Sequence, residues 1–229
     1  MTHGLPLVVT RPEPGNAITV ARAAALGLDV RAMPLFAAHT LHWTPPAAGD
    51  YDAMLLTSTQ AVRLAGPQLA ALAALPVYAV GDATAAAAAA AGLTVARTGE
   101  ADAQSLLDVM ASKKMARILW LCGRDRSAFD ARGMALQPLP CYTVDPVDPP
   151  SPWSGLIAAP AVLLAHSARA ARRIAALAGP SRAHLALVAI SPAVAAAAGT
   201  GWAARTASAQ PTDAGMLALA AALCHKGEK

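Results

Sequence analysis

The stretch AMLLTSTQAVR, residues 53–63, recurs later in the chain as VLLAHSARAAR, residues 162–172. In both copies a short apolar run leads into a serine, Ser58 or Ser167, and then into a segment with helical composition. An unpatterned apolar run of this length is typical of a parallel strand that is buried on both faces. Each copy therefore predicts a buried strand followed by a helix.

Further segments repeat in the same order and at a nearly constant offset. The matched pairs are 77–85 with 187–195, 95–98 with 203–206, 105–107 with 215–217, and 7–11 with 120–124. The repeat predicts two similar domains. Two such domains leave a cleft between them, which is a common place for a ligand.

Short apolar runs alternate with alanine-rich segments along the whole chain. We expect strands at 5–9, 53–57, 77–80, 93–96, 117–121, 161–165 and 185–190. We expect helices at 13–26, 59–75, 83–91, 103–112, 169–178, 192–198 and 213–223. Strands that alternate with helices of this length indicate βαβ units and a parallel sheet, so the predicted fold class is α/β.

The composition excludes several classes of protein. The net charge is +4, but the basic residues form no stripe with interleaved aromatic residues, so we expect no nucleic-acid binding. Polar residues and Pro192 interrupt the longest uncharged stretch, 183–202, and no signal peptide opens the chain, so we expect a cytoplasmic protein without a membrane segment. Three widely spaced cysteines predict neither a disulfide framework nor a metal site.

Polar residues and glycines follow most of the predicted strands, at the position where ligands of open parallel sheets bind. They are Thr10, Arg11, Thr57, Ser58, Gly81, Gly123, Arg124, Ser167 and Ser191. The amides at a helix start attract anions, so these positions favour an anionic ligand. A serine that only caps its helix is the alternative at each serine position. The sequence contains no nucleotide-binding loop, dinucleotide fingerprint or serine-nucleophile elbow.

Tyr142 lies outside the predicted core strands, after a segment that contains Pro138 and Pro140. A phenol is neutral at pH 7 and can donate a hydrogen bond or, weakly, a proton. The alternative is a ring that only packs between the two domains.

Four segments, taken in order, resemble the uroporphyrinogen-III synthase family. They are LVVTRP at 7–12, LLTSTQAV at 55–62, YAVGDATA at 78–85 and PTDAGML at 211–217. No single segment is decisive, but their order and spacing are specific, and the resemblance extends over nearly the whole chain. It implies two flavodoxin-like domains with parallel sheets, joined by a two-stranded linker, with a cleft between them. One domain comprises 1–35 and 148–229, the other comprises 40–140, and the connecting strands are 36–39 and 141–147.

The resemblance also implies the reaction. The family cyclises hydroxymethylbilane to uroporphyrinogen III, with inversion of ring D and loss of water, and uses no metal or organic cofactor. The eight carboxylates of this substrate agree with the anion-binding pattern at the strand ends. We expect a monomer that makes transient contact with hydroxymethylbilane synthase, the enzyme that supplies the substrate.

Matched residue by residue, Tyr142 corresponds to the tyrosine that is proposed to assist departure of the hydroxyl group. The implied substrate-binding residues are Thr10, Arg11, Thr57, Ser58, Gly81, Thr84, Gly123, Arg124, Ser167, Ser191 and Thr212. Three features depart from the family pattern: the segment after Arg124 is too short for a full crossover helix, His166 replaces a threonine, and Ser191 replaces a glycine.

Two other functions are compatible with the sequence. A non-catalytic two-domain protein that binds an anionic small molecule would use the same cleft and arginines, with Tyr142 as a packing ring. A degenerate synthase domain could instead serve as an interaction module. Turnover of hydroxymethylbilane distinguishes the synthase from both.

Overall fold

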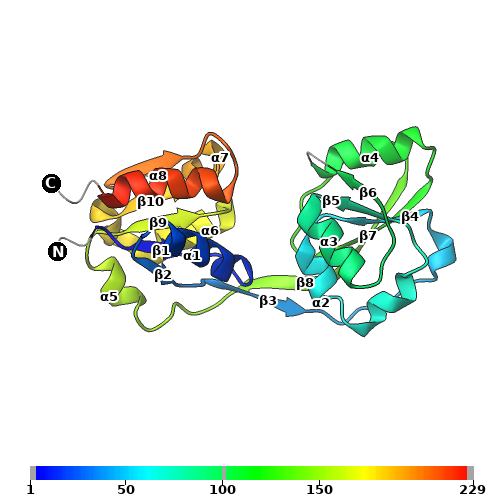
Figure 1. Ribbon diagram of the computed structural model, residues 1–229, viewed down its shortest axis with the longest axis horizontal. Helices are drawn as coiled ribbons and strands as arrows, with labels where there is room; N and C mark the ends of the chain where they lie inside the picture. The colour runs from blue at the N-terminus through cyan, green and yellow to red at the C-terminus, as the bar shows by residue number, and fades with distance from the viewer. Residues whose placement is uncertain (1–3, 100–101, 226–229) are drawn as a thin grey trace. The chain divides into compact units, whose positions relative to one another are not determined.

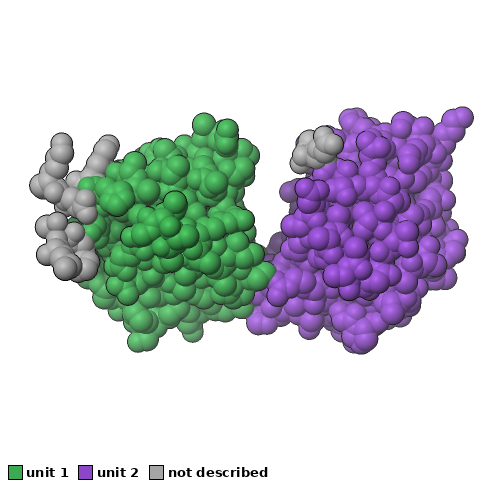
Figure 2. All heavy atoms as spheres, viewed as in Figure 1, with its two compact units in different colours: residues 1–37, 146–229 green, residues 38–145 purple. Residues whose placement is uncertain are grey.

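The computed structural model describes residues 4–99 and 102–225. The chain forms two compact units (Figure 2): unit 1 is Met1–Ala37 with Pro146–Lys229, and unit 2 is Ala38–Asp145. The chain leaves unit 1 within strand β3 (Phe36–Thr40) and returns at the end of β8 (Ala135–Pro146).

Unit 1 contains a five-stranded sheet in the order β11-β10-β9-β1-β2 (Figure 1). Its strands are β1 (Leu7–Val9), β2 (Val30–Ala32), β9 (Val162–Ala165), β10 (Ala186–Ala189) and β11 (Ala204–Ala207). All neighbouring strands in this sheet pair in parallel. The order is the flavodoxin-like 2-1-3-4-5 arrangement.

Helices cover this sheet and supply the apolar residues of its core. They are α1 (Gly15–Ala25), α5 (Trp153–Ile157), α6 (Ala168–Ala178), α7 (Pro192–Ala197) and α8 (Asp213–His225), with a 3-10 helix at Gly179–His184. Residues of α1 and α8, such as Met216, form one core cluster with alternate residues of β1, β9 and β10, such as Val9 and Leu164. α6 and α7 pack against each other and against β9 and β10.

Unit 2 contains a six-stranded sheet in the order β3-β8-β7-β4-β5-β6. Besides β3 and β8, its strands are β4 (Ala53–Leu56), β5 (Val77–Val80), β6 (Val95–Gly99) and β7 (Arg117–Gly123). The strands from β8 to β6 pair in parallel.

The helices of unit 2 enclose two core clusters made from alternate residues of the same strands. They are α2 (Thr59–Leu64), α3 (Asp82–Ala90) and α4 (Ala103–Ser112), with 3-10 helices at Ala48–Asp50 and Pro67–Leu72. One cluster joins α2, α3 and the second 3-10 helix to Met54, Leu56 and Leu119. The other joins α4 to Leu55 and Trp120.

The sheet orders confirm the internal repeat. β2-β1-β9-β10-β11 of unit 1 corresponds to β8-β7-β4-β5-β6 of unit 2, and β3 is added beyond β8. The chain order differs, because unit 2 forms strands β4, β5 and β6 before β7 and β8. The point where the strand order reverses, at which such sheets bind ligands, lies between β1 and β9 in unit 1 and between β7 and β4 in unit 2.

Some element predictions were wrong. The sequence does not predict the edge strands β2 and β11, because none of their residues is buried, or the helix α5, because its five residues are too few to show a helical pattern. The predicted helix at 59–75 is two helices, because Gly66 (φ 76°) and Pro67 end α2 and begin a 3-10 helix. β8 includes most of the segment 141–147 that the resemblance gives as a connecting strand, and it begins at Ala135.

Candidate active site

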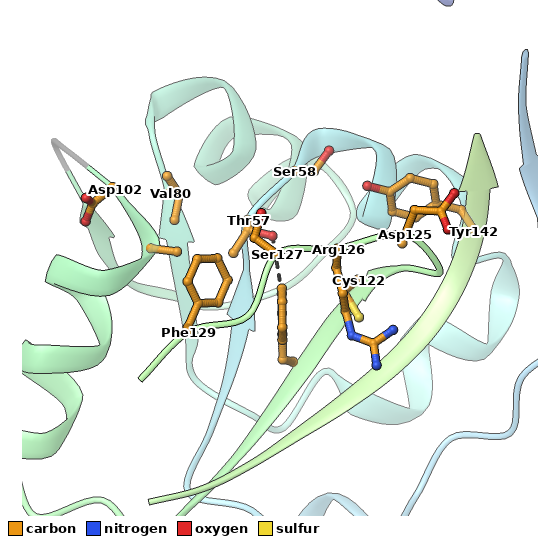
Figure 3. Close-up of a pocket in the computed structure, with 13 residues that line it drawn as sticks. Thr57, Ser58, Val80, Asp102, Cys122, Asp125, Arg126, Ser127, Phe129 and Tyr142 are labelled. Atoms are coloured by element: carbon orange, nitrogen blue, oxygen red, sulfur yellow. Dashed lines mark hydrogen bonds between the residues drawn. The ribbon is translucent and has the colours of Figure 1, made fainter. Parts of the chain in front are cut away.

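A pocket of about 430 Å³ lies at the carboxyl ends of β4 and β7 in unit 2, where a sheet of this order is expected to bind ligands. All of its lining residues belong to unit 2. The pocket brings together four predicted site residues: Thr57, Ser58, Gly123 and Tyr142 (Figure 3).

Tyr142 and Gly123 face each other on the neighbouring strands β8 and β7. A Cβ atom added at Gly123 would lie 2.9 Å from Cζ of Tyr142 and 3.1 Å from the phenol oxygen. The absence of a side chain at Gly123 therefore makes room for the phenol. Figure 3 shows the Tyr142 hydroxyl directed toward Ser58.

The phenol of Tyr142 is held in its neutral form. Burial raises the pKa of Tyr142, and a hydrogen bond with the Ser58 side chain opposes this shift without reversing it. A neutral phenol beside the carboxyl ends of β4 and β7 can donate a hydrogen bond to an oxygen atom of a ligand.

Thr57 and Ser58 are positioned by the start of α2. Ser58 is the N-cap residue, and its hydroxyl accepts a hydrogen bond from the Gln60 amide at 3.2 Å. The Thr57 hydroxyl accepts a hydrogen bond from the indole Nε1 of Trp120 at 3.2 Å, the dashed line in Figure 3. These bonds fix both hydroxyl groups at the pocket wall.

Residues 124–134, all of them described, connect β7 to β8 without a helix. This confirms that the segment after Arg124 is too short for a crossover helix. Phe129 of this loop packs on Trp120, with ring centroids 4.9 Å apart, and Met134 joins the same core cluster. The guanidinium of Arg126 lies 6.0 Å from the centre of the Trp120 ring. In place of a helix, the loop thus places the Phe129 ring and the Arg126 cation against Trp120 of β7, beside the pocket.

Cys122 also lines the pocket, but its thiol is not a nucleophile. Burial raises the pKa of Cys122 to about 11, that of Cys141 to about 12 and that of Cys224 to about 11. The reactive form of a cysteine is the thiolate, so all three side chains remain as thiols near neutral pH.

We expect the native protein to resist alkylation by iodoacetamide at pH 8, because roughly one Cys122 thiol in a thousand is ionised there and all three cysteines are buried. Intact-mass measurement should show no adduct on the native protein. The control is the protein unfolded in guanidinium chloride, which should gain three adducts. Rapid modification of the native protein would show that at least one thiol is exposed and ionised.

The predicted residues of unit 1 lie at the ends of its own strands. Thr10 is completely buried, and its hydroxyl donates to the Leu164 carbonyl oxygen at 3.0 Å, which ties β1 to β9. Ser167 and Ser191 cap α6 and α7 by accepting hydrogen bonds from the amides of Ala170 and Val194. The Thr212 hydroxyl accepts a hydrogen bond from the Gly215 amide in the first turn of α8.

Ser191 and Gly81 occupy matching positions of the repeat with different backbone conformations. Gly81 has φ 77°, in the left-handed region that favours glycine. Ser191 has φ −154°, an extended conformation that suits a capping serine. Ser191 therefore needs no positive φ. Thr84, in the first turn of α3, is buried, and its amide donates to the Gly81 carbonyl oxygen.

Arg124 and Arg11 differ in their surroundings. Arg124 forms a 2.6 Å ion pair with Asp145 and lines a second pocket, of about 520 Å³, beside the first. Arg11, in unit 1, lies 3.7 Å from the carboxylate of Asp213, which also contacts His166.

Sequence reasoning missed several residues of these sites. Asp125, Arg126 and Phe129 lie on the loop after β7, and the shortness of that segment was the available signal. Asp213 had a weaker signal, its place directly after Pro211 and Thr212 in one of the family motifs.

The described residues contain no group of three or more histidine, cysteine, aspartate or glutamate side chains that could hold a metal ion. In the same parts of the chain, every helix is too short or too polar to cross a lipid bilayer.

Comparisons with known proteins identify the family. The family model described as uroporphyrinogen-III synthase HemD matches residues 19–218. The structure of uroporphyrinogen-III synthetase from Helicobacter pylori 26695 is similar, with a TM-score of 0.69 and 15% identity over 96% of this chain and 99% of the other. A mutant uroporphyrinogen III synthase from the extremely thermophilic bacterium Thermus thermophilus gives a TM-score of 0.54 and 16% identity over 97% and 99%.

A search of curated proteins finds no match. The two solved structures share the fold, and the family model covers most of the sequence. The chain belongs to the uroporphyrinogen-III synthase family, the cyclising lyases of tetrapyrrole biosynthesis.

Proposed function

We propose that the pocket around Tyr142 is where this uroporphyrinogen-III synthase acts on the reacting end of hydroxymethylbilane. The observation that supports the proposal is the meeting of Tyr142, Ser58, Thr57 and Gly123 in one pocket, in a chain that matches the family model. These four residues come from three separate segments of unit 2.

The proposed role of Tyr142 is to assist departure of the terminal hydroxyl group. The pyrrole rings supply the electrons that expel the hydroxyl, leaving an azafulvene cation, and a spiro intermediate then leads to inversion of ring D. Tyr142 donates a hydrogen bond to the departing oxygen, for which its phenol must be neutral. The raised pKa of Tyr142 maintains that form.

The main contribution of the protein to this reaction is to fix the conformation of the substrate. Free hydroxymethylbilane closes by itself to the isomer in which ring D is not inverted, so the enzyme must hold a flexible chain in one reactive conformation. The backbone at the starts of α3 and α6 and the side chains of Arg11 and Arg124 hold substrate carboxylates. Substrate-binding residues thus come from both units, and no metal or organic cofactor takes part.

The enzyme acts as a cytoplasmic monomer, and transient contact with hydroxymethylbilane synthase delivers a substrate that would otherwise close spontaneously. The strands β3 and β8, through which the chain passes between the units, are the proposed linker.

The test is a coupled assay. Hydroxymethylbilane is generated in place by its synthase, this protein is added, and the oxidised porphyrins are separated by isomer. Isomer III should exceed its level in a control without this protein. Formation of isomer I alone, with a protein shown to be folded by circular dichroism, would refute the proposal.

Tyr142→Phe is expected to lower kcat by clearly less than the ~100-fold typical of losing a required general acid. The ring of phenylalanine keeps the packing over Gly123, and only the hydrogen bond to the departing oxygen is lost. The coupled assay measures kcat directly.

The matched control is Tyr78→Phe, which removes a buried phenol that accepts a hydrogen bond from Lys113 at 3.2 Å, outside the pocket. Its kcat should equal that of the unmodified enzyme. A folded Tyr142→Phe protein without any activity would contradict the assisting role, because it would make the phenol indispensable.

A further inference from the structure

Asp213 is the centre of a polar cluster in unit 1. Its carboxylate accepts hydrogen bonds from the Thr19 hydroxyl at 2.8 Å and from the Arg22 guanidinium at 3.0 Å. The His166 Nε2 atom lies 3.1 Å from the same carboxylate. The Nη1 atom of Arg11 lies 3.7 Å from Asp213 and donates to the Thr19 hydroxyl at 3.3 Å.

The cluster lies at the point where the strand order of the unit 1 sheet reverses. Arg11 follows β1, His166 follows β9, and Asp213 is the first residue of α8. Ligands of such sheets bind at this point. The cluster therefore occupies the unit 1 counterpart of the Tyr142 pocket in unit 2.

The Arg11 side chain passes over Gly15 and reaches the cluster. A Cβ atom added at Gly15 would overlap the guanidinium of Arg11, so the guanidinium rests on the first turn of α1 where a side chain is missing. About a third of the Arg11 side chain is exposed (34%), whereas Asp213 is almost covered (9%). Asp213 is thus the buried member of this ion pair, and Arg11 is the member that is partly exposed to solvent.

The charges of the cluster do not cancel. Burial, and then the charge of Arg11, lower the pKa of His166, so its ring is neutral at pH 7. Its buried Nδ1 atom has no hydrogen-bond partner among the described residues, which also disfavours a second N–H. Burial alone would raise the pKa of Asp213, but hydrogen bonds from His166, Thr19 and Arg22 outweigh it and lower that pKa.

Two guanidinium groups therefore share one carboxylate. Among these groups the two positive charges of Arg11 and Arg22 exceed the single negative charge of Asp213, which suits an anion.

We propose that Asp213 is a positioning residue that holds Arg11 in the orientation in which Arg11 binds a substrate carboxylate. The inference rests on the proposed function, in which Arg11 contacts the substrate. Asp213 itself touches no substrate. The Thr19 hydroxyl takes part, because it donates to Asp213 and accepts from Arg11 and so joins the two groups.

A double-mutant cycle tests the inference with KM and kcat from the coupled assay. Arg11→Ala should raise KM for hydroxymethylbilane by about tenfold, the effect of losing one charged hydrogen bond. Asp213→Asn, which keeps the shape but removes the charge, should raise KM by several-fold and leave kcat nearly unchanged. In the Arg11→Ala background, Asp213→Asn should raise KM no further.

The matched control is Asp29→Asn, which breaks the exposed 3.0 Å ion pair between Asp29 and Arg31 in the same unit. KM should not change in this variant. Thermal unfolding of every variant separates a loss of stability at the start of α8 from an effect on substrate binding.

Three outcomes would overturn the inference. If Asp213→Asn raises KM equally with and without Arg11, Asp213 does not act through Arg11. If Asp213→Asn leaves KM unchanged in the presence of Arg11, Asp213 does not position it. If Arg11→Ala leaves KM unchanged while isomer III still forms, Arg11 binds no carboxylate, although the synthase activity itself stands.

Thr19→Val keeps the test decisive should Asp213→Asn fail to fold. This variant removes the bridging hydroxyl at nearly constant volume. It should raise KM only when Arg11 is present, and an equal rise in the Arg11→Ala background would again overturn the inference.

Discussion

Replacing Gly123 by valine is expected to lower kcat by about 100-fold, more than Tyr142→Phe, because the displaced ring also misplaces the reacting end of the substrate by about 1 Å. The backbone of Gly123 is not in the left-handed region, so it accepts a side chain without strain. The Cβ atom itself would lie 2.9 Å from the Tyr142 ring, and the ring must move. The displaced phenol then loses its hydrogen bond with the Ser58 side chain and occupies part of the pocket that the substrate needs.

Two comparisons make this prediction specific. Gly49→Val is the control, since a Cβ atom at Gly49 has no neighbour within 4 Å and Gly49 lies outside the pocket. Its kcat should be unchanged. Gly123→Val combined with Tyr142→Phe should be no slower than Gly123→Val alone, because both changes act on the same phenol. A Gly123→Val enzyme with unaltered kcat would show that the position of the phenol is irrelevant to turnover.

The local sequence pattern predicted the central strands well. β4 and β9 are completely buried on both faces, so an uninterrupted apolar run marks them in each copy of the repeat. The edge strands β2 and β11 are different. Their residues are half-buried or exposed, and their pairing with β1 and β10 decides their conformation. No pattern in the residues of β2 or β11 themselves predicts that pairing.

The same distinction applies to the candidate site. A serine before a helix is a local signal, and Ser58, Ser167 and Ser191 all proved to be N-cap residues. Thr10 also follows a strand, but its hydroxyl is used for a bond to Leu164, far away in the sequence.

Asp213 shows the limit of local reasoning most clearly. Its partner Arg11 follows the first strand of the chain and its partner Thr19 lies in the first helix, whereas Asp213 begins the last helix. Only the order of strands in the sheet brings them together. Knowledge of the sheet order, and not of the residues alone, was therefore necessary to find the cluster.

Leu55→Ala and Leu164→Ala are each expected to lower the free energy of unfolding by about 2–5 kcal/mol, the usual range for a buried leucine that leaves a cavity. The two residues occupy matching positions of the repeat, in β4 and β9, and both are completely buried. Leu55 belongs to a core cluster of unit 2, and Leu164 belongs to one of unit 1. Urea unfolding followed by circular dichroism measures the loss.

Leu26→Ala is the control for these two variants, because Leu26 is largely exposed (56%) and should change the free energy of unfolding by no more than about 0.5 kcal/mol. The clusters around Leu55 and Leu164 share no residue, so the losses measured for the two variants should add in the double variant. If Leu55→Ala were as mild as Leu26→Ala while Leu164→Ala were severe, the two positions would not be equivalent in packing. The repeat would then describe the sheet order of the two units but not the construction of their cores.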